Sequence, residues 1–428
     1  MTESDVMFDG SSLTKQRNVE SVSSSGFDKL TDELVIETLI RLPIKPANFC
    51  KCVSRRFHSL ISSSYFVRCY VNHHQINNSF ALYYQSKPTF HNLIRPSLMG
   101  IDIAFEFPIF ESPGFSLSFL ACSDQQKQET LQYLASNNGL VLCCAALRRP
   151  IVYFVCNPLT KQWIALPPPP SNVKTVYIGF ICNPQYSCNT DHEQGRKTRF
   201  KVVRIEVVNC DSPRQPSGTL KLEIFCSVSG IWTEYFMSSS TSDHELFNGW
   251  NYRCPSAVVC DGILHWDTLS NCGIFTYDPS NGECKTIELP HEVRKPVWAF
   301  KYCLGESGGR LRYANFSWDD TNYRVWELNN GGEWLLLHKV HLDEMKSTVQ
   351  TINKDCMGLL SPHPLNHDII FFWCRSSCRI VEYNMENKLL KLPCFLRDAR
   401  IISLLSPMFF PFVLPCWPTT VPLIQSMA

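Results

Sequence analysis

The sequence predicts an α+β multidomain protein, with a small N-terminal helical module followed by an all-β propeller of about seven blades. Helical periodicity is confined to residues 27–75, and strand-like runs dominate after residue 76. A strand–turn–strand pattern recurs there roughly every fifty residues, which is typical of propeller blades. The expected organisation is a polar tail over 1–26, the helical module over 27–75 and the propeller over 76–428.

The composition excludes some classes of function. Lys and Arg number 40 and Asp and Glu 39, a net charge of +1, so no overall field attracts nucleic acid or an anionic membrane. The first 26 residues are polar and contain no signal-peptide pattern. We therefore expect a reducing compartment, the cytoplasm or nucleus, where the 21 cysteines are mostly buried thiols.

The first helix is expected to begin after Thr31, a good N-cap, and to end at Pro43. Pro46 suits the first position of a second helical segment, in which Phe49, Val53 and Phe57 recur every four residues. A kink at Ser54 would divide this segment into two short helices. So few residues cannot bury both apolar stripes, so the module either packs on the rest of the chain or docks a partner.

The stretch "LTDELVIETLIRLPIKPANFCKCVSRRFHSLISSSYFVRCYV" closely resembles the F-box of plant-type F-box proteins. Thr31 replaces the family's proline, and Phe57 replaces its tryptophan. The resemblance implies docking to the Skp-family adaptor of an SCF-type, cullin-based ubiquitin ligase. The adaptor-facing residues that it implies are Leu34, Ile36, Leu39, Leu42, Pro43, Cys52, Val53, Phe57 and Leu60.

The rest of the chain is rich in β-branched and aromatic runs bounded by Gly, Pro, Asn or Ser. The expected strands include 80–84, 139–144, 151–157, 200–208, 221–227, 273–278, 323–328, 368–374 and 379–384. Aromatic residues at equivalent strand positions are separated by 71, 52, 49 and 57 residues: Phe154, Phe225, Tyr277, Trp326 and Tyr383. The longest interval indicates an insertion within 182–198.

Trp163, Trp232 and Trp334 open the outer strand of three repeats, and we expect them to be buried in the joints between blades. "NNGLVLCC" (137–144), "NPLTKQWIALP" (157–167) and "CDGILHWDT" (260–268) resemble the F-box-associated, kelch-like β-propeller. That resemblance implies that loops on one rim bind a substrate protein, although the sequence identifies neither the substrate nor the residues that bind it.

Metal binding and catalysis have weaker support in the sequence than protein binding. His363, His367, Cys374 and Cys378 have tolerable zinc-ligand spacing, but the cysteines fit the mouth of a hairpin, so no metal is expected. The run 265–267, His-Trp-Asp, fits a joint between blades better than acid–base catalysis. Phosphate-loop, G-x-S-x-G and H-E-x-x-H motifs are missing, so we expect no cofactor and no catalysis.

The apolar run 401–417 contains three prolines, which would break a membrane-spanning helix. We expect instead that strands from 79–86 and 400–410 lie in one sheet or in adjacent sheets and close the ring. Pro407 and Pro411 would then lie at strand ends or on an edge.

These features predict a non-catalytic adaptor with two ends: the helical module docks to the Skp-family adaptor and cullin core, and the propeller binds the substrate protein. Two alternatives remain. The first is an interaction scaffold or transcriptional cofactor acting outside a ligase, and the second is a propeller enzyme, which would need carboxylates converging on the central channel.

Overall fold

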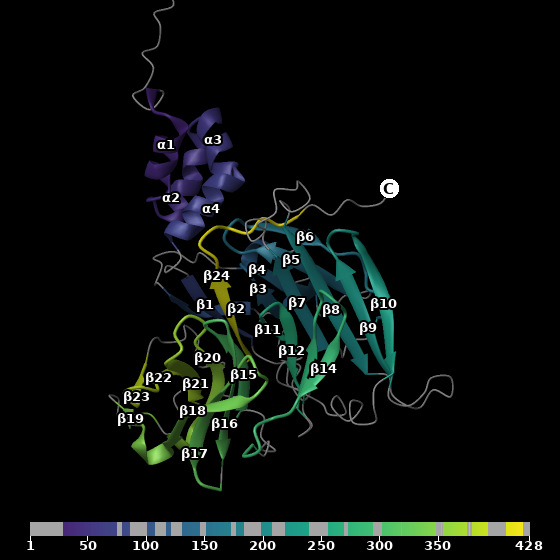
Figure 1. Ribbon diagram of the computed structural model, residues 1–428, viewed down its shortest axis with the longest axis vertical. Helices are drawn as coiled ribbons and strands as arrows, with labels where there is room; N and C mark the ends of the chain where they lie inside the picture. Colours follow the sequence, from purple (N-terminus) through teal and green to yellow (C-terminus); the bar gives the residue numbers. More distant parts are fainter. Residues whose placement is uncertain are drawn as a thin grey trace, which may run out of the picture. The chain divides into compact units, whose positions relative to one another are not determined.

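The computed structural model describes residues 29–74, 79–85, 101–107, 117–120, 131–145, 151–172, 177–183, 198–207, 219–238, 256–268, 273–293, 302–317, 319–347, 352, 354–374, 376, 379–392 and 408–422. The chain divides into two compact units, residues 1–66 and 67–428. The division falls inside a helix, and the sequence-based boundary at 75/76 stays a prediction. Each unit is described by itself below (Figure 1).

The helices are α1 (Asp32–Leu39), α2 (Ile44–Phe49), α3 (Arg55–Ser62) and α4 (Ser64–His73), with a 3₁₀ turn, η2, at Cys50–Cys52. Thr31 caps α1 as predicted, because its hydroxyl accepts the N–H of Leu34. Helix α2 begins two residues before the predicted position, with Pro43 as its N-cap. Pro46 therefore lies inside the first turn, where backbone N–H groups lack intrahelical partners and a proline is tolerated.

Ser54 divides the second helical segment, as its sequence indicates. Its backbone is extended, with φ −156°, and its hydroxyl accepts the N–H of Phe57 at 3.1 Å, so α3 begins as a new helix. Arg56 on α3 binds the start of α1: its Nη2 lies 2.7 Å from a carboxylate oxygen of Asp32 and 2.6 Å from the carbonyl oxygen of Leu30.

The described part of the larger unit forms six sheets. The first sheet has the pairing order β2 (Ile101–Phe107), β1 (Ser79–Gln85), β24 (Met408–Leu414). The next two are β3 (Leu131–Asn137), β4 (Leu140–Ala145), β5 (Val152–Asn157), β6 (Gln162–Ala165), and β7 (Tyr177–Asn183), β8 (Arg199–Val207), β9 (Thr219–Cys226), β10 (Ile231–Ser238).

The fourth and fifth sheets are β11 (Val258–Cys260), β12 (Ile263–Asp267), β13 (Ile274–Tyr277), β14 (Cys284–Ile287), and β15 (Tyr302–Ser307), β16 (Arg310–Ser317), β17 (Asn322–Leu328), β18 (Trp334–His341). The sixth contains β20 (Met357–Pro362), β21 (Ile369–Cys374), β22 (Arg379–Asn384), β23 (Leu389–Lys391) and β19 (Lys346–Ser347). All neighbouring strands are antiparallel except β19 and β23.

The repeat predicted from aromatic spacing is confirmed. The five aromatic residues lie in β5, β9, β13, β17 and β22, the third strand of five successive sheets, and all five are buried. The described sheets number six, whereas the sequence predicts about seven. The repeats are 49 to 71 residues apart, so dividing the chain length by fifty overestimates the number.

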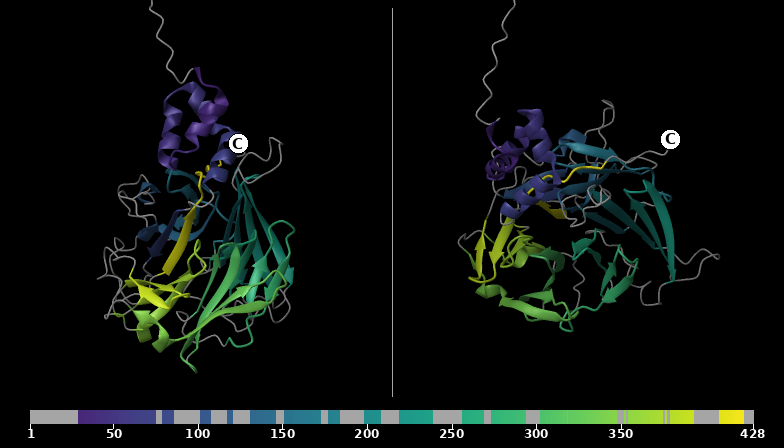
Figure 2. Two further views of the ribbon diagram at one scale, coloured as in Figure 1. Left: turned by 60° about the vertical axis from the view of Figure 1, so that its left-hand side comes forward. Right: turned by 45° about the horizontal axis from the view of Figure 1, so that its top comes forward.

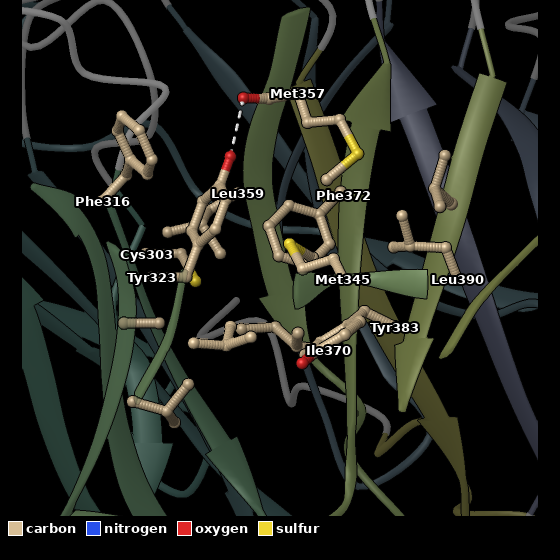
Figure 3. Close-up of a cluster of buried hydrophobic side chains, with 14 of the residues drawn as sticks. Cys303, Phe316, Tyr323, Met345, Met357, Leu359, Ile370, Phe372, Tyr383 and Leu390 are labelled. Atoms are coloured by element: carbon tan, nitrogen blue, oxygen red, sulfur yellow. Dashed lines mark hydrogen bonds between the residues drawn. The ribbon is translucent and has the colours of Figure 1, made fainter. Parts of the chain in front are cut away.

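The sheets of this unit pack in sequence around a common centre (Figure 2, right). Neighbouring sheets share buried apolar clusters, from the second sheet through to the sixth. Figure 3 shows the joint between the last two sheets, where the Tyr323 hydroxyl donates to the Met357 carbonyl at 3.2 Å.

The predicted closure of the ring is confirmed. Strand β24 pairs with β1 along its whole length, from Ser79 opposite Leu414 to Gln85 opposite Met408. Phe80 of β1 packs on Phe371 of the sixth sheet, with ring centroids 5.6 Å apart, and Phe410 of β24 packs on Tyr133 of the second sheet at 4.5 Å.

Of the two prolines predicted at strand ends or on an edge, the structure describes Pro411. Pro411 lies within β24 and opposite Leu82, in the edge strand of its sheet, where the missing N–H leaves no ladder partner unpaired. Pro407 is outside the described residues. Among the described residues, no helix is long and apolar enough to cross a bilayer.

The three tryptophans occupy equivalent places, each near the start of the outermost strand of a different sheet. The indole N–H of Trp232 donates to the Pro167 carbonyl at 2.9 Å, and that of Trp334 to the Glu288 carbonyl at 2.8 Å. Each acceptor lies within two residues of the end of the outer strand of the preceding sheet, so these two tryptophans do join blades.

The expected burial of these tryptophans is wrong for Trp163, which is 48% exposed. Trp163 lies in the second sheet, and the described part of the preceding sheet has three strands. In the third and fifth sheets the indole donates to a carbonyl that follows the fourth strand of the preceding sheet, whereas the three described strands before Trp163 offer no equivalent carbonyl. Trp232 and Trp334 are partly buried.

Candidate functional site

The predicted docking residues of the helical unit fall into two groups. Leu34, Pro43, Cys52 and Val53 are exposed, with 53% of Leu34 and 69% of Val53 accessible to solvent. The others are partly buried, as are Leu42 and Leu60, or buried, as are Ile36, Leu39 and Phe57. The first group forms an accessible apolar face on α1 and around η2, whereas the buried residues hold the helices together.

Phe57 packs inside the helical unit, and the adaptor contact that its family position implies stays a prediction. It is 9% exposed and lies one turn into α3, beside the Ser54 cap. The four-residue spacing that connects it with Phe49 and Val53 crosses the break at Ser54. Because the chain changes direction there, Phe49 and Val53 point to solvent and Phe57 points into the unit.

Phe49 is the most exposed large apolar side chain of the described residues, at 73%. The family pattern did not place it among the docking residues, although its spacing from Val53 was a usable signal. We define the docking face as Leu34, Phe49, Cys52 and Val53.

Basic side chains border the docking face. Lys51 lies within η2, and burial lowers its pKa. Arg55 is exposed in the first turn of α3, two residues after Val53. An apolar face with a basic border suits a protein surface that combines apolar contacts with acidic side chains.

A propeller enzyme would need carboxylates on the inner strands of the larger unit. Among the described inner strands β3, β7, β11, β15, β20 and β24, the acidic residue is Glu306. Burial raises the pKa of Glu306, and its carboxylate accepts the N–H of Gly309 in the adjoining turn at 2.5 Å. This hydrogen bond of Glu306 therefore lies within its own β15–β16 hairpin.

The predicted joint role of the 265–267 run is confirmed by Trp266. Its indole N–H donates to the carbonyl of Ile178 in the third sheet at 3.0 Å. His265 is buried, with Nδ1 at 3.1 Å from the Ile263 carbonyl oxygen, and burial lowers its pKa. The Trp266 bond therefore connects the fourth sheet to the third, whereas the His265 contact lies within its own strand.

His363 serves a turn. Its Nδ1 accepts the backbone N–H groups of Leu365 and Asn366, both at 3.0 Å, and its ring lies 4.7 Å from that of Phe80. Burial lowers the pKa of His363 to about 4. In the described part of the chain no group of three or more His, Cys, Asp or Glu side chains is arranged to hold a metal, and Cys378 lies outside it.

A fully buried ion pair lies in the third sheet. The guanidinium of Arg204 contacts the carboxylate of Glu223 and donates to the Ser171 carbonyl at 3.1 Å. The rings of Tyr153 and Trp232 lie 5.7 and 5.9 Å from its central carbon. These partners belong to two neighbouring sheets, so the pair fixes their joint.

The described cysteines are free thiols, and seven of the fourteen are buried. Burial raises the pKa of several of them, including Cys144, Cys182 and Cys260, each to about 12. These thiols therefore stay protonated at neutral pH and pack as small apolar side chains.

Comparison with known proteins gives the family. A family model described as F-box protein At3g26010-like, beta-propeller, matches residues 109–400, and the F-box domain model matches residues 27–69. F-box protein At3g26010 of Arabidopsis thaliana is 25% identical over 368 residues, which cover 84% of this chain and 78% of that protein. The putative F-box protein At3g23970 of the same plant is 26% identical over 377 residues, covering 84% and 85%. The putative F-box/kelch-repeat protein At4g22430, also from that plant, is 22% identical over 369 residues, covering 84% and 79%. The chain thus belongs to the family of F-box proteins that carry an At3g26010-like β-propeller.

Proposed function

We propose that the chain is the substrate-recognition subunit of an SCF-type, cullin-based ubiquitin ligase, acting in the cytoplasm or nucleus. The helical unit docks to the Skp-family adaptor, and the larger unit binds the substrate protein. The chain itself makes and breaks no covalent bond. It raises the effective concentration of substrate lysines near the ubiquitin-conjugating enzyme.

The docking face is the observation that carries this proposal. Phe49 and Val53 are about 70% exposed, although large apolar side chains gain free energy by leaving water. They lie in an F-box, the domain whose general partner is a Skp-family adaptor. The larger unit, residues 67–428, contributes no residue to this face and offers its own surface to a second protein.

Two matched substitutions test the proposal in the full chain. Val53 is 69% exposed in the F-box, and Val228 is 67% exposed in the larger unit. We expect Val53→Asp to weaken adaptor binding at least tenfold, because a charge would be desolvated in an apolar interface. Val228→Asp should leave adaptor binding unchanged.

The measurement is co-purification with a Skp-family adaptor and a cullin, followed by calorimetric titration of the adaptor. Equal binding by both variants would show that the docking face is misplaced. Retention of the adaptor without the cullin would favour the scaffold or transcriptional cofactor instead. The enzyme alternative gains no support from Glu306, whose carboxylate accepts a bond from its own turn.

A further inference from the structure

The outer edge of β10 has no pairing partner among the strands that the structure describes. Strand β10 is the last strand of the third sheet (Figure 1). It pairs with β9 over all eight of its residues, from Ile231 opposite Cys226 to Ser238 opposite Thr219, with no break in register. An edge of this kind presents a row of backbone N–H and C=O groups that can pair with another strand.

The other outer strands are protected against such pairing. Strands β6 and β14 have four residues each. In β2 and in β18 an extra residue shifts the register, and a bulge of this kind disrupts the ladder that a new strand would continue. The short parallel strand β19 pairs with β23. Within the described part of the chain, β10 is therefore the outer strand whose long and regular edge is left open.

The side chains of β10 suit an interface. Ile231, Tyr235 and Phe236 are each about half exposed. Glu234 forms an ion pair with Lys221 of β9 at 2.6 Å, so the charge beside this edge is balanced within the chain. The Lys221 ammonium also lies 6.0 Å from the centre of the Phe236 ring. An apolar edge with balanced charge favours a partner of the same character over a strongly acidic or basic one.

A second copy of the chain has this character, because β10 can pair with itself. In a symmetric antiparallel pair of identical strands the two-fold axis is perpendicular to the sheet, so one residue lies opposite its own counterpart. With Tyr235 at that position, residues 232–238 of both copies pair, and Glu234 lies opposite Phe236. Centring the pair on Thr233 or Phe236 would pair fewer residues of β10, and centring it on Glu234 would place two carboxylates opposite each other.

The register centred on Tyr235 also brings opposite charges together. Lys221 of β9 lies opposite Phe236 of β10, and Glu234 of the second copy lies on the other side of that Phe236. Residues directly opposite one another share a face of the sheet, so all three side chains lie on one face. Lys221 and the second copy's Glu234 are two strand spacings apart, about 9.6 Å, a gap that these two long side chains can span. The chain's net charge of +1 adds little repulsion between copies.

We propose that the chain forms a symmetric dimer through β10, with Tyr235 on the two-fold axis. The third sheets of the two copies, four strands each, become one continuous sheet. The exposed apolar side chains of β10 supply on the order of 300 Å² per copy, less than half of the roughly 800 Å² that each partner gives to a standard interface. The dimer therefore dissociates on dilution. It carries two F-boxes, a property that goes beyond the proposed function of one chain.

Sedimentation equilibrium of the full chain at about 1–100 µM, the range in which a small interface dissociates, tests the dimer. Tyr235→Lys places two ammonium groups opposite each other and should weaken dimerisation at least tenfold. Leu335→Lys in β18 is the matched control and should leave dimerisation unchanged, since Leu335 is 50% exposed and Tyr235 is 52% exposed. Hydrogen exchange of β9 reports whether both variants are folded.

Two results of this measurement would overturn the proposal. Equal weakening by both variants would mean that exposed apolar side chains associate without a defined interface. A chain that stays monomeric over the whole range would leave the edge of β10 to a strand of another protein.

A charge-swap pair tests the two-fold axis itself. Tyr235→Lys copies and Tyr235→Glu copies should each dimerise poorly, because like charges then face each other. A mixture of the two variants should form heterodimers about tenfold more strongly than either variant forms homodimers, because the facing charges are opposite. Different affinity tags on the two variants allow the heterodimer to be captured and quantified. If the mixture associates no better than the separate variants, position 235 does not face itself and the proposal is wrong.

Discussion

Phe57 and Phe49 give opposite predictions for the same substitution, aromatic to alanine. Phe57 is 9% exposed inside the helical unit, whereas Phe49 is 73% exposed on the docking face. Removing a buried phenylalanine side chain costs about 3–5 kcal/mol of unfolding free energy. A core as small as that of the F-box supplies rarely more than about 3–5 kcal/mol in total. Phe57→Ala should therefore unfold the helices, and adaptor binding should disappear with them.

Phe49→Ala should act on the interface alone. The helices should stay folded, because an exposed side chain contributes little to the core, while adaptor binding should weaken by about 2 kcal/mol, roughly thirtyfold. Hydrogen exchange of α1–α3 in the full chain reports folding, and titration of the adaptor reports binding. If Phe57→Ala lost adaptor binding while its helices kept full protection, Phe57 would contact the partner directly and our assignment of core and face would be refuted.

Two further predictions concern the larger unit. Trp232→Phe should lower the unfolding free energy of the larger unit by about 1–3 kcal/mol, because the Pro167 carbonyl loses its donor. Trp163→Phe should change that free energy by less than about 0.5 kcal/mol. Chemical denaturation of both variants checks this. The pKa of His363 is about 4 in the folded chain, against about 6.5 when unfolded, so the unfolded state binds more protons between these values. Stability should fall by up to about 3 kcal/mol as the pH drops from about 6.5 towards 4. His363→Asn keeps an acceptor for the turn and should flatten that pH dependence; an unchanged slope would exclude His363 as its source.

Much of the architecture follows from the residues themselves. The aromatic spacing located the third strand of five sheets because each sheet repeats the same buried position. The pairing of β1 with β24 followed from the need to satisfy edge strands and from the apolar character of 401–417. Both predictions depend on periodic or local requirements that every blade must meet.

The sequence could not decide features that depend on one particular neighbour. The exposure of Trp163 depends on what the preceding sheet places beside it, which no local pattern reveals. The direction of Phe57 depends on the Ser54 cap, since the same spacing fits a continuous helix and a broken one. The packing of Thr419, after β24, could not be predicted either, because its contacts are with Asn138 and Asn157, far away along the chain.

The pairing of β1 with β24 also has a consequence for the order of events during synthesis. About 320 residues separate the two strands, so at about 5–20 residues per second a ribosome needs roughly 15–65 s between finishing β1 and supplying its partner. Throughout that interval one edge of β1 has no native neighbour, although the intervening sheets can already fold. The nascent chain is therefore most vulnerable to wrong strand pairing in this period, and its need for chaperones should end when residues 408–414 leave the ribosome.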